Sequence, residues 1–263
     1  IKELSQQLDT YPVEEIRECL KMISFYGFPV AEYLDDCIIE RGVENTVREP
    51  VFSEIKRISI NPNPSKKYGR ASTPYNSIFY GLIYKKNTPE KFKILNRIGC
   101  SCEIVDLLRN NKQGKALVTF SKWKVVQQLN VVAIIDPFKK YEDKTLNNLQ
   151  QFMTKNFNIT LDQKKIMQFF AKEFSTEILP YKNHEYLISS LYTEFLIQTL
   201  GYDGVLYPSV QSKKFGLDFL CIALSKEAVN KLKPQKILQC GINKTESDIT
   251  YNNLMSCEIK DVS

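Results

Sequence analysis

The sequence predicts an α+β protein in which helices flank a mixed central sheet. Residues 205–207 and 217–224 are short apolar runs of strand-forming side chains, which indicates buried strands. Residues 121–126 and 129–135 have the same character. Residues 143–178 instead place aromatic side chains at helical spacing in a lysine-rich background, which is typical of amphipathic helices. Strands interspersed with helices of this kind favour the α+β class.

The first fifty residues predict a pair of helices in front of this core. In the first helix, Pro12 can occupy the opening turn, which leaves Glu14 and Glu15 near the positive end of the helix dipole. A second helix is expected from about residue 30 to the Arg-Gly pair at residues 41–42, because glycine commonly ends helices.

Three segments are therefore expected along the chain. Residues 1–50 form a helical segment, residues 51–241 form the main domain, and residues 242–263 form a polar tail. With 263 residues and 43% hydrophobic composition, the chain can bury one large core.

Residues 201–209 are expected to turn out of a helix and enter a strand. Gly201 and the Asp203-Gly204 pair can supply the positive φ angles that a helix exit and a tight corner require. Pro208 must end the strand, because proline cannot donate a ladder hydrogen bond. Ser209 then lies on a connection between two core strands, a common place for function, although a Pro-Ser pair is also typical of a plain turn.

The charge of the chain is unevenly distributed. The formal net charge is +6, yet residues 1–50 hold 5 basic and 11 acidic side chains, so the remainder carries +12. A basic body can bind nucleic acid or a phosphorylated small molecule, and no recognised nucleic-acid module is present. The ten glycines form neither a Gly-x-Gly-x-x-Gly motif nor a phosphate-binding loop, which argues against a Rossmann hydride-transfer enzyme.

Seven cysteines, an odd number spread through apolar segments, indicate buried thiols in a reducing compartment. We therefore expect a cytoplasmic protein with no membrane segment. With one histidine and one close cysteine pair, at Cys100 and Cys102, no zinc site of familiar spacing can be assembled.

Two motifs carry a resemblance to a known family. The sequence Tyr-Asp-Gly-Val-Leu-Tyr-Pro-Ser at residues 202–209 resembles the closing motif of RES domains, a family named for an arginine, a glutamate and a serine. Residues 68–81 are similar to the segment in which these domains carry their arginine and, on the next strand, a tyrosine. The matched residues are Gly69, Arg70, Ser77, Tyr80 and Ser209.

This chain departs from the family pattern at two places. Ser72 or Thr73 stands where the family has an asparagine, and Tyr75-Asn76 stands where it has a turn glycine. We expect the turn to survive, because asparagine tolerates a left-handed conformation.

Two further residues match the family by their order along the chain. Arg57 ends a strand-like run at residues 52–60, where the family has an earlier arginine. Glu103 falls on an expected helix at residues 97–108, where the family has its glutamate. By itself, an acidic residue on an amphipathic helix is usually only solvated.

The resemblance implies an ADP-ribosyltransferase-like fold and an enzyme that consumes NAD as a substrate rather than as a cofactor. RES domains cleave the nicotinamide-ribose bond with water or phosphate, or transfer ADP-ribose to a protein, and many are toxins paired with an antitoxin. It implies that Glu103 stabilises the charge that develops on the ribose, and that Ser209 bonds the ribose or the glutamate. Arg57 and Arg70 would bind the pyrophosphate, and Tyr80 would pack on the nicotinamide or close the ribose pocket.

Two alternatives remain open at this point. One is a binding or interaction protein that keeps the RES scaffold without turnover, which is favoured if the departures at Ser72 and Tyr75 disable the pocket. The other is a nucleic-acid binder that uses the basic body.

Overall fold

One nine-stranded mixed sheet runs through the protein, and the α+β expectation is confirmed. The computed structural model describes residues 1–23, 28–33, 36–141, 144–156, 158–178, 182–211 and 219–259. The strands are β1 (Val30–Tyr33), β2 (Cys37–Glu44), β3 (Phe79–Lys85), β4 (Gly114–Val125), β5 (Leu129–Ala133), β6 (Gly204–Pro208), β7 (Leu220–Leu224), β8 (Leu232–Lys244) and β9 (Ile249–Glu258). Their order is β1-β5-β6-β7-β3-β2-β4-β8-β9. Among the described strand pairs, β5 and β6 are parallel and the others antiparallel.

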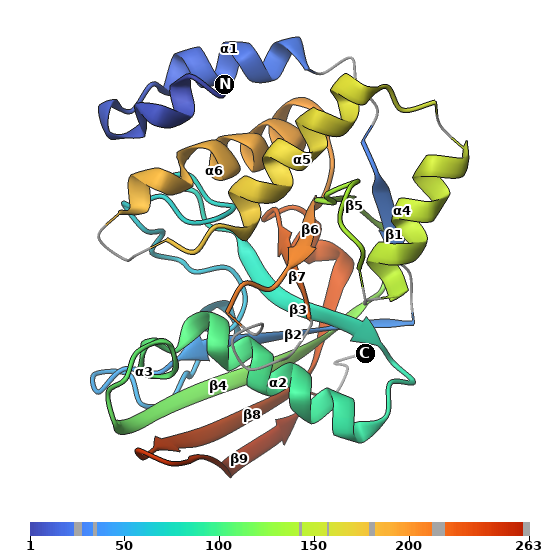
Figure 1. Ribbon diagram of the computed structural model, residues 1–263. Helices are drawn as coiled ribbons and strands as arrows, with labels where there is room; N and C mark the ends of the chain where they lie inside the picture. Colours follow the sequence, from blue (N-terminus) through green and yellow to red (C-terminus); the bar gives the residue numbers. More distant parts are fainter. Residues whose placement is uncertain are drawn as a thin grey trace.

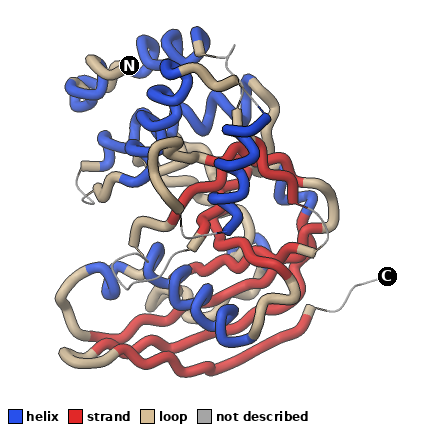
Figure 2. Tube along the Cα trace, turned by 45° about the vertical axis from the view of Figure 1, so that its right-hand side comes forward, coloured by secondary structure: helices blue, strands red, loops and turns tan. Residues whose placement is uncertain are grey.

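The helices gather in two places. They are α1 (Val13–Met22), α2 (Glu90–Ile104), α3 (Asp106–Arg109), α4 (Lys144–Asn156), α5 (Leu161–Ser175) and α6 (Leu187–Glu194), which continues into a π-helical turn (Phe195–Thr199). In Figure 1, α1, α5 and α6 lie together at one end of the molecule, whereas α2 and α3 pack near the long strands β4 and β8. In Figure 2 the first of these groups again lies beyond one end of the strands, while other helices lie alongside the strands.

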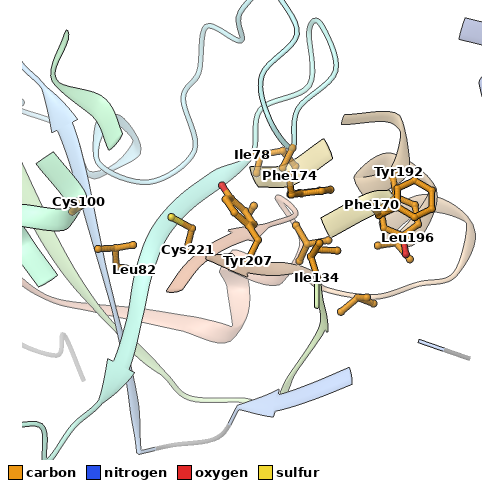
Figure 3. Packing of buried hydrophobic residues seen from close by; sticks show 14 of the residues in the cluster. Ile78, Leu82, Cys100, Ile134, Phe170, Phe174, Tyr192, Leu196, Tyr207 and Cys221 are labelled. Atoms are coloured by element: carbon orange, nitrogen blue, oxygen red, sulfur yellow. The ribbon is translucent and has the colours of Figure 1, made fainter. Parts of the chain in front are cut away.

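Alternate residues of the central strands point into two separate cores, as the strand period of two requires. Val205 and Tyr207 of β6 belong to the cluster that includes Phe174 of α5, shown in Figure 3. Leu206 points the other way, into a cluster that includes Leu146 of α4. Both faces of β6 are therefore buried, which explains its unbroken apolar sequence.

The predicted second amino-terminal helix is wrong. Residues 30–33 and 37–42 of that region belong to β1 and β2 instead, while residues 34–35 lie outside the described residues. β2 lies between β3 and β4 in the sheet. Residues 37–42 are all buried, so this strand shows no alternation of polar and apolar side chains. The apolar spacing that resembled a helix face is a buried strand, and residues 1–50 are not a separate helical segment. The first expected helix is present as α1.

Two further expectations about local structure are corrected. Residues 242–263 are not merely a polar tail, since the whole of β9 lies within them and pairs with β8. Most of β9 is exposed, including Leu254 and Met255, so the strand has no buried apolar face to mark it in the sequence. The expected strand at residues 52–60 contains a single 3₁₀ turn (Ile55–Arg57), from which Ile58 enters the core.

The two glycines at the start of the 201–209 segment serve different purposes. Gly201 adopts a φ of 76°, as expected, whereas Gly204 is not in the left-handed region. A Cβ on Gly204 would lie 2.0 Å from the carbonyl oxygen of Ala223, so glycine is required there for close approach of β6 and β7. The corner is held by Asp203, whose carboxylate accepts a 2.8 Å hydrogen bond from the backbone N–H of Asn130.

Other sequence expectations agree with the structure. β4 and β5 occupy the expected strand regions near residues 121–126 and 129–135, and α4 and α5 occupy the expected helical region. β7 begins at Leu220, while residues 217–218 of that predicted strand lie outside the described residues. Most of the cysteines are buried, and burial raises the pKa of Cys100 and Cys102 to about 12.

Truncation will test the place of β2 in the sheet. We expect removal of residues 1–47 to abolish cooperative unfolding, because it takes a central strand from between β3 and β4. Removal of residues 1–7 is the control, since the 3₁₀ turn there (Leu4–Gln6) contains no buried residue. A cooperative thermal transition in the longer truncation would contradict this topology.

Two glycine substitutions separate conformational strain from close approach. Gly201→Ala should lower the free energy of unfolding by about 1 kcal/mol, because the only obstacle is the positive φ and no atom lies within 4 Å of the new Cβ. Gly204→Ala should cost about 3 kcal/mol, because the new Cβ meets backbone. Urea denaturation measures the free energy of unfolding of both variants. Equal losses in the two variants would contradict the close approach of backbone to Gly204.

Candidate functional site

The structure brings Glu103 and Ser209 together from positions 106 residues apart in the sequence. The Oγ of Ser209 donates a hydrogen bond to Oε1 of Glu103, and the backbone N–H of Gln211 donates to the same oxygen at 3.1 Å. Ser209 is itself held by its backbone N–H, which donates to the carbonyl of Phe219 at 2.8 Å. The carboxylate at the end of α2 is therefore fixed by the connection that follows β6.

A glycine on α2 allows this approach. A Cβ on Gly99 would lie 2.3 Å from the ring of Phe219, the residue whose carbonyl accepts the hydrogen bond from the Ser209 N–H. Gly99 and Glu103 are four residues apart and so lie on the same side of the helix. The helix can reach the Ser209 connection only because residue 99 has no side chain.

Tyr207 and Cys221 form the buried floor beside this pair. They are register partners on β6 and β7 and lie side by side in Figure 3. Burial raises the pKa of the Cys221 thiol well above its usual value, and the negative charge of Glu103 and the positive charge of Arg70 act on it in opposite directions. The pKa of Tyr207 is also raised, chiefly by burial. Glu103 and Arg70 thus approach the same floor.

Arg70 is buried and partly engaged by backbone. Its Nη1 donates to the carbonyl of Phe174 and, at 3.1 Å, to the carbonyl of Thr176. Its guanidinium carbon lies 5.2 Å from the centre of the Tyr186 ring. These contacts tie the Arg70 loop to the carboxyl end of α5, where a cation also meets the negative end of the helix dipole.

Tyr80 holds the same loop from the other side. Its hydroxyl accepts a 3.1 Å hydrogen bond from the backbone N–H of Ala71 and also interacts with the side chain of Ser72. A Cβ on Gly69 would lie 2.7 Å from the Ser72 Oγ, so a side chain at residue 69 would displace that hydroxyl. Ser72, one of the departures from the family pattern, therefore has a structural partner in Tyr80.

The second departure adopts a conformation that the sequence did not predict. Tyr75 has a φ of 63°, whereas Asn76 was expected to take the left-handed position. The Tyr75 side chain is largely exposed, and its backbone N–H donates to the carbonyl of Ser65 at 2.8 Å. A turn glycine is thus replaced by a tyrosine in the same left-handed region, at an energetic cost.

Arg57 lies in a different set of contacts. Its Nε and Nη2 bind the Glu49 carboxylate at 2.8 and 2.6 Å, and its guanidinium lies 4.9 Å from the centre of the Phe52 ring. Neither of these partners contacts Glu103 or Ser209 among the interactions of the described chain. Within the described chain, Arg57 thus makes no hydrogen bond or ion pair with the other four candidates, although its positive charge acts on Arg41 of β2.

Arg41 is a candidate that sequence reasoning missed. It projects from β2, donates from Nη1 to the carbonyl of Tyr80 at 2.9 Å, and lies 5.1 Å from the centre of the Phe79 ring. Its buried Nε has no hydrogen-bond partner in the described structure, and burial lowers its pKa to about 10. Its charge and that of Glu103 both act on Cys100, so both side chains lie in the neighbourhood of that thiol. One signal was available, since Arg41 interrupts the apolar run of residues 37–43.

Metal binding has no evident support within the described part of the chain. No group of three histidine, cysteine, aspartate or glutamate side chains is placed there to hold a metal ion. Over the same residues, no helix combines the length and apolar character needed to cross a bilayer.

A double-mutant cycle will test the Glu103 contact. Ser209→Ala and Glu103→Gln should show a coupling energy of about 2 kcal/mol in the free energy of unfolding, as a hydrogen bond to a charged group predicts. Ser189→Ala combined with Glu103→Gln is the control, because the buried Ser189 hydroxyl donates to the carbonyl of Tyr186 instead. Additive effects in both cycles would contradict the contact.

The sequence was compared with protein-family models and with curated proteins. No protein-family model matches the chain, and no curated protein matches it in sequence. The site is therefore supported by its geometry and by the two short motifs.

Proposed function

We propose that this protein is an NAD-consuming enzyme with an ADP-ribosyltransferase-like fold that cleaves the nicotinamide-ribose bond. The observation that carries the proposal is the hydrogen-bonded pair of Glu103 and Ser209, because the resemblance to RES domains assigns Ser209 from a motif and Glu103 independently, from its order along the chain. Arg70 and Tyr80, assigned from another motif, hold one loop that adjoins the same buried floor.

The geometry of Glu103 suits this reaction. Both Ser209 and Gln211 donate to Oε1, so Oε2 is the oxygen that can approach a ribose. As the bond between ribose C1′ and the nicotinamide nitrogen breaks, its electron pair leaves with nicotinamide and positive charge develops on the sugar. A fixed carboxylate stabilises that charge more strongly in the transition state than in the ground state. An acceptor oxygen then bonds to C1′ and loses its proton.

Buried arginines supply the opposite charge that a dinucleotide requires. Arg41 keeps a buried Nε–H without a partner in the described structure, and such a donor fits a pyrophosphate oxygen. Arg70 can add a second cation, although its Nη1 is committed to the end of α5. The proposal thus transfers the role expected of Arg57 to Arg41.

The proposal also includes the biological setting that the resemblance implies, which is a cytoplasmic toxin restrained by an antitoxin.

One observation favours the alternative of a binding protein without turnover. Arg70 Nη1 and the Tyr80 hydroxyl, both expected to meet substrate, are already hydrogen-bonded within the protein. Such a protein would bind NAD and leave it intact.

Turnover of NAD by single-residue variants separates these functions. Glu103→Gln should keep the affinity for NAD and lower nicotinamide release by about 100-fold or more, a loss of roughly 3 kcal/mol in transition-state stabilisation. Asp106→Asn is the matched control, because Asp106 is an exposed acid three residues away that pairs with Arg109. Calorimetry gives the affinity, and mass spectrometry of the reaction gives the rate.

The outcomes differ clearly between the candidates. Calorimetric binding of NAD by the wild-type protein without any nicotinamide release identifies the binding protein. Wild-type turnover in Glu103→Gln would show that Glu103 has no catalytic role.

A further inference from the structure

A lysine-lined groove of about 660 Å³ lies beside the candidate site. Its charged and polar lining comprises Lys2, Asp136, Lys139, Lys165, Gln168, Lys172 and Ser175. Tyr141 and Phe169 add aromatic surface, and Pro208 forms the side next to Ser209. Four lysines thus face one aspartate in a concavity within the usual size of small-molecule sites.

The topology of the sheet places this groove where ligands commonly bind. β5 and β6 are parallel, with Ala133 opposite Leu206, so their carboxyl ends reach the same edge of the sheet. Asp136 follows one of these ends and Pro208 completes the other. Crevices outside the carboxyl ends of parallel strands are the general ligand sites of open sheets with helical crossovers.

The helix α5 contributes a single face to the groove. Lys165, Phe169 and Lys172 recur at spacings of four and three residues, so their side chains point the same way. The opposite wall is the segment after β5, where the Lys139 ammonium lies 5.6 Å from the centre of the Tyr141 ring.

The positive charge of the groove is only weakly compensated. The carboxylate of Asp136 accepts a 2.9 Å hydrogen bond from the backbone N–H of Phe138. Lys165 lies 3.4 Å from Asp162, but both side chains are exposed, so the pair contributes little. Lys172 acts on the neighbouring Glu173 at longer range, and within the described chain neither Lys2 nor Lys172 makes an ion pair. An anion in the groove would therefore find available ammonium groups.

We propose that this groove binds the adenylate half of the dinucleotide substrate, with the lysines on its phosphate and the aromatic side chains against its base. The inference rests on the proposed function for the identity of the ligand. Pro208 directly precedes Ser209, and Ser175 lies between Phe174 and Thr176, whose carbonyls bind Arg70. A dinucleotide with its ribose at Glu103 can extend past Arg70 into the groove.

Calorimetry on the full chain tests this without any catalytic step. AMP should bind the wild-type protein, and the double variant Lys139→Gln/Lys172→Gln should bind it about tenfold or more weakly. The control is Lys115→Gln/Lys155→Gln, which removes the same charge from exposed positions on β4 and α4 outside the groove. The control variant should bind AMP as the wild-type protein does. Equal AMP affinity in the two double variants would overturn the proposal.

Two further probes identify what the groove recognises. Inorganic phosphate and adenosine should each bind more weakly than AMP, because each has half of the contacts. Phosphate that binds as tightly as AMP would reduce the site to a simple anion site and overturn the adenylate assignment.

AMP binding and nicotinamide release test the groove and the proposed function separately. Lysine-dependent AMP binding without nicotinamide release from NAD supports the groove and rejects the enzyme. Nicotinamide release by a protein whose AMP affinity is insensitive to these lysines supports the enzyme and rejects the groove.

Discussion

The contact between the Glu103 carboxylate and the connection after β6 is the interaction on which the account of this protein depends. It joins a helix that packs on β2 and β3 to a segment that leaves β6, so it fixes one part of the sheet's surface against another. Three features support it. Gly99 allows close approach, the Phe219 carbonyl orients Ser209, and the Gln211 N–H adds a second donor. Two fixed donors to one carboxylate oxygen hold the Glu103 side chain in one orientation.

The loop that carries Arg70 is fixed by an equally dense set of bonds. Tyr80 binds it from the sheet, and the end of α5 binds the guanidinium itself. Thr73 donates to the Glu194 carboxylate at 2.8 Å, and Glu194 also accepts from Arg17 of α1 at 2.8 Å. The amino-terminal helix is therefore part of the support of the site, and its acidic character does not make it an independent unit.

Sequence patterns predicted the parts of the fold whose burial is regular. The apolar run of β6, the positive φ at Gly201 and the helical stretches of α4 and α5 follow from period and local chemistry. β2 was missed because burial on both faces removes the alternation that marks a strand. β9 was missed because its apolar residues, such as Leu254 and Met255, are exposed and do not alternate regularly along the strand. Gly204 was assigned to a turn because a close approach between two strands leaves no local signature.

Arg70, Tyr80 and Ser209 were predicted from motifs, whereas Glu103 and Arg57 were predicted from their order along the chain. Glu103 and Ser209 meet, and Arg70 and Tyr80 support one loop, whereas Arg57 pairs with Glu49. Arg41 escaped notice because its role depends on β2 lying beside β3, a long-range pairing that no local pattern encodes.

Isotope tracing of the cleaved bond tests the central claim most directly. NAD incubated with the wild-type protein in ¹⁸O-labelled water without phosphate should yield free nicotinamide together with ADP-ribose that carries one heavy oxygen at ribose C1′. Addition of phosphate or of a protein acceptor would divert that product and reveal the acceptor. Recovery of intact NAD under both conditions, or cleavage at the pyrophosphate to give AMP, would contradict the assignment of Glu103 and Ser209 to the nicotinamide-ribose bond.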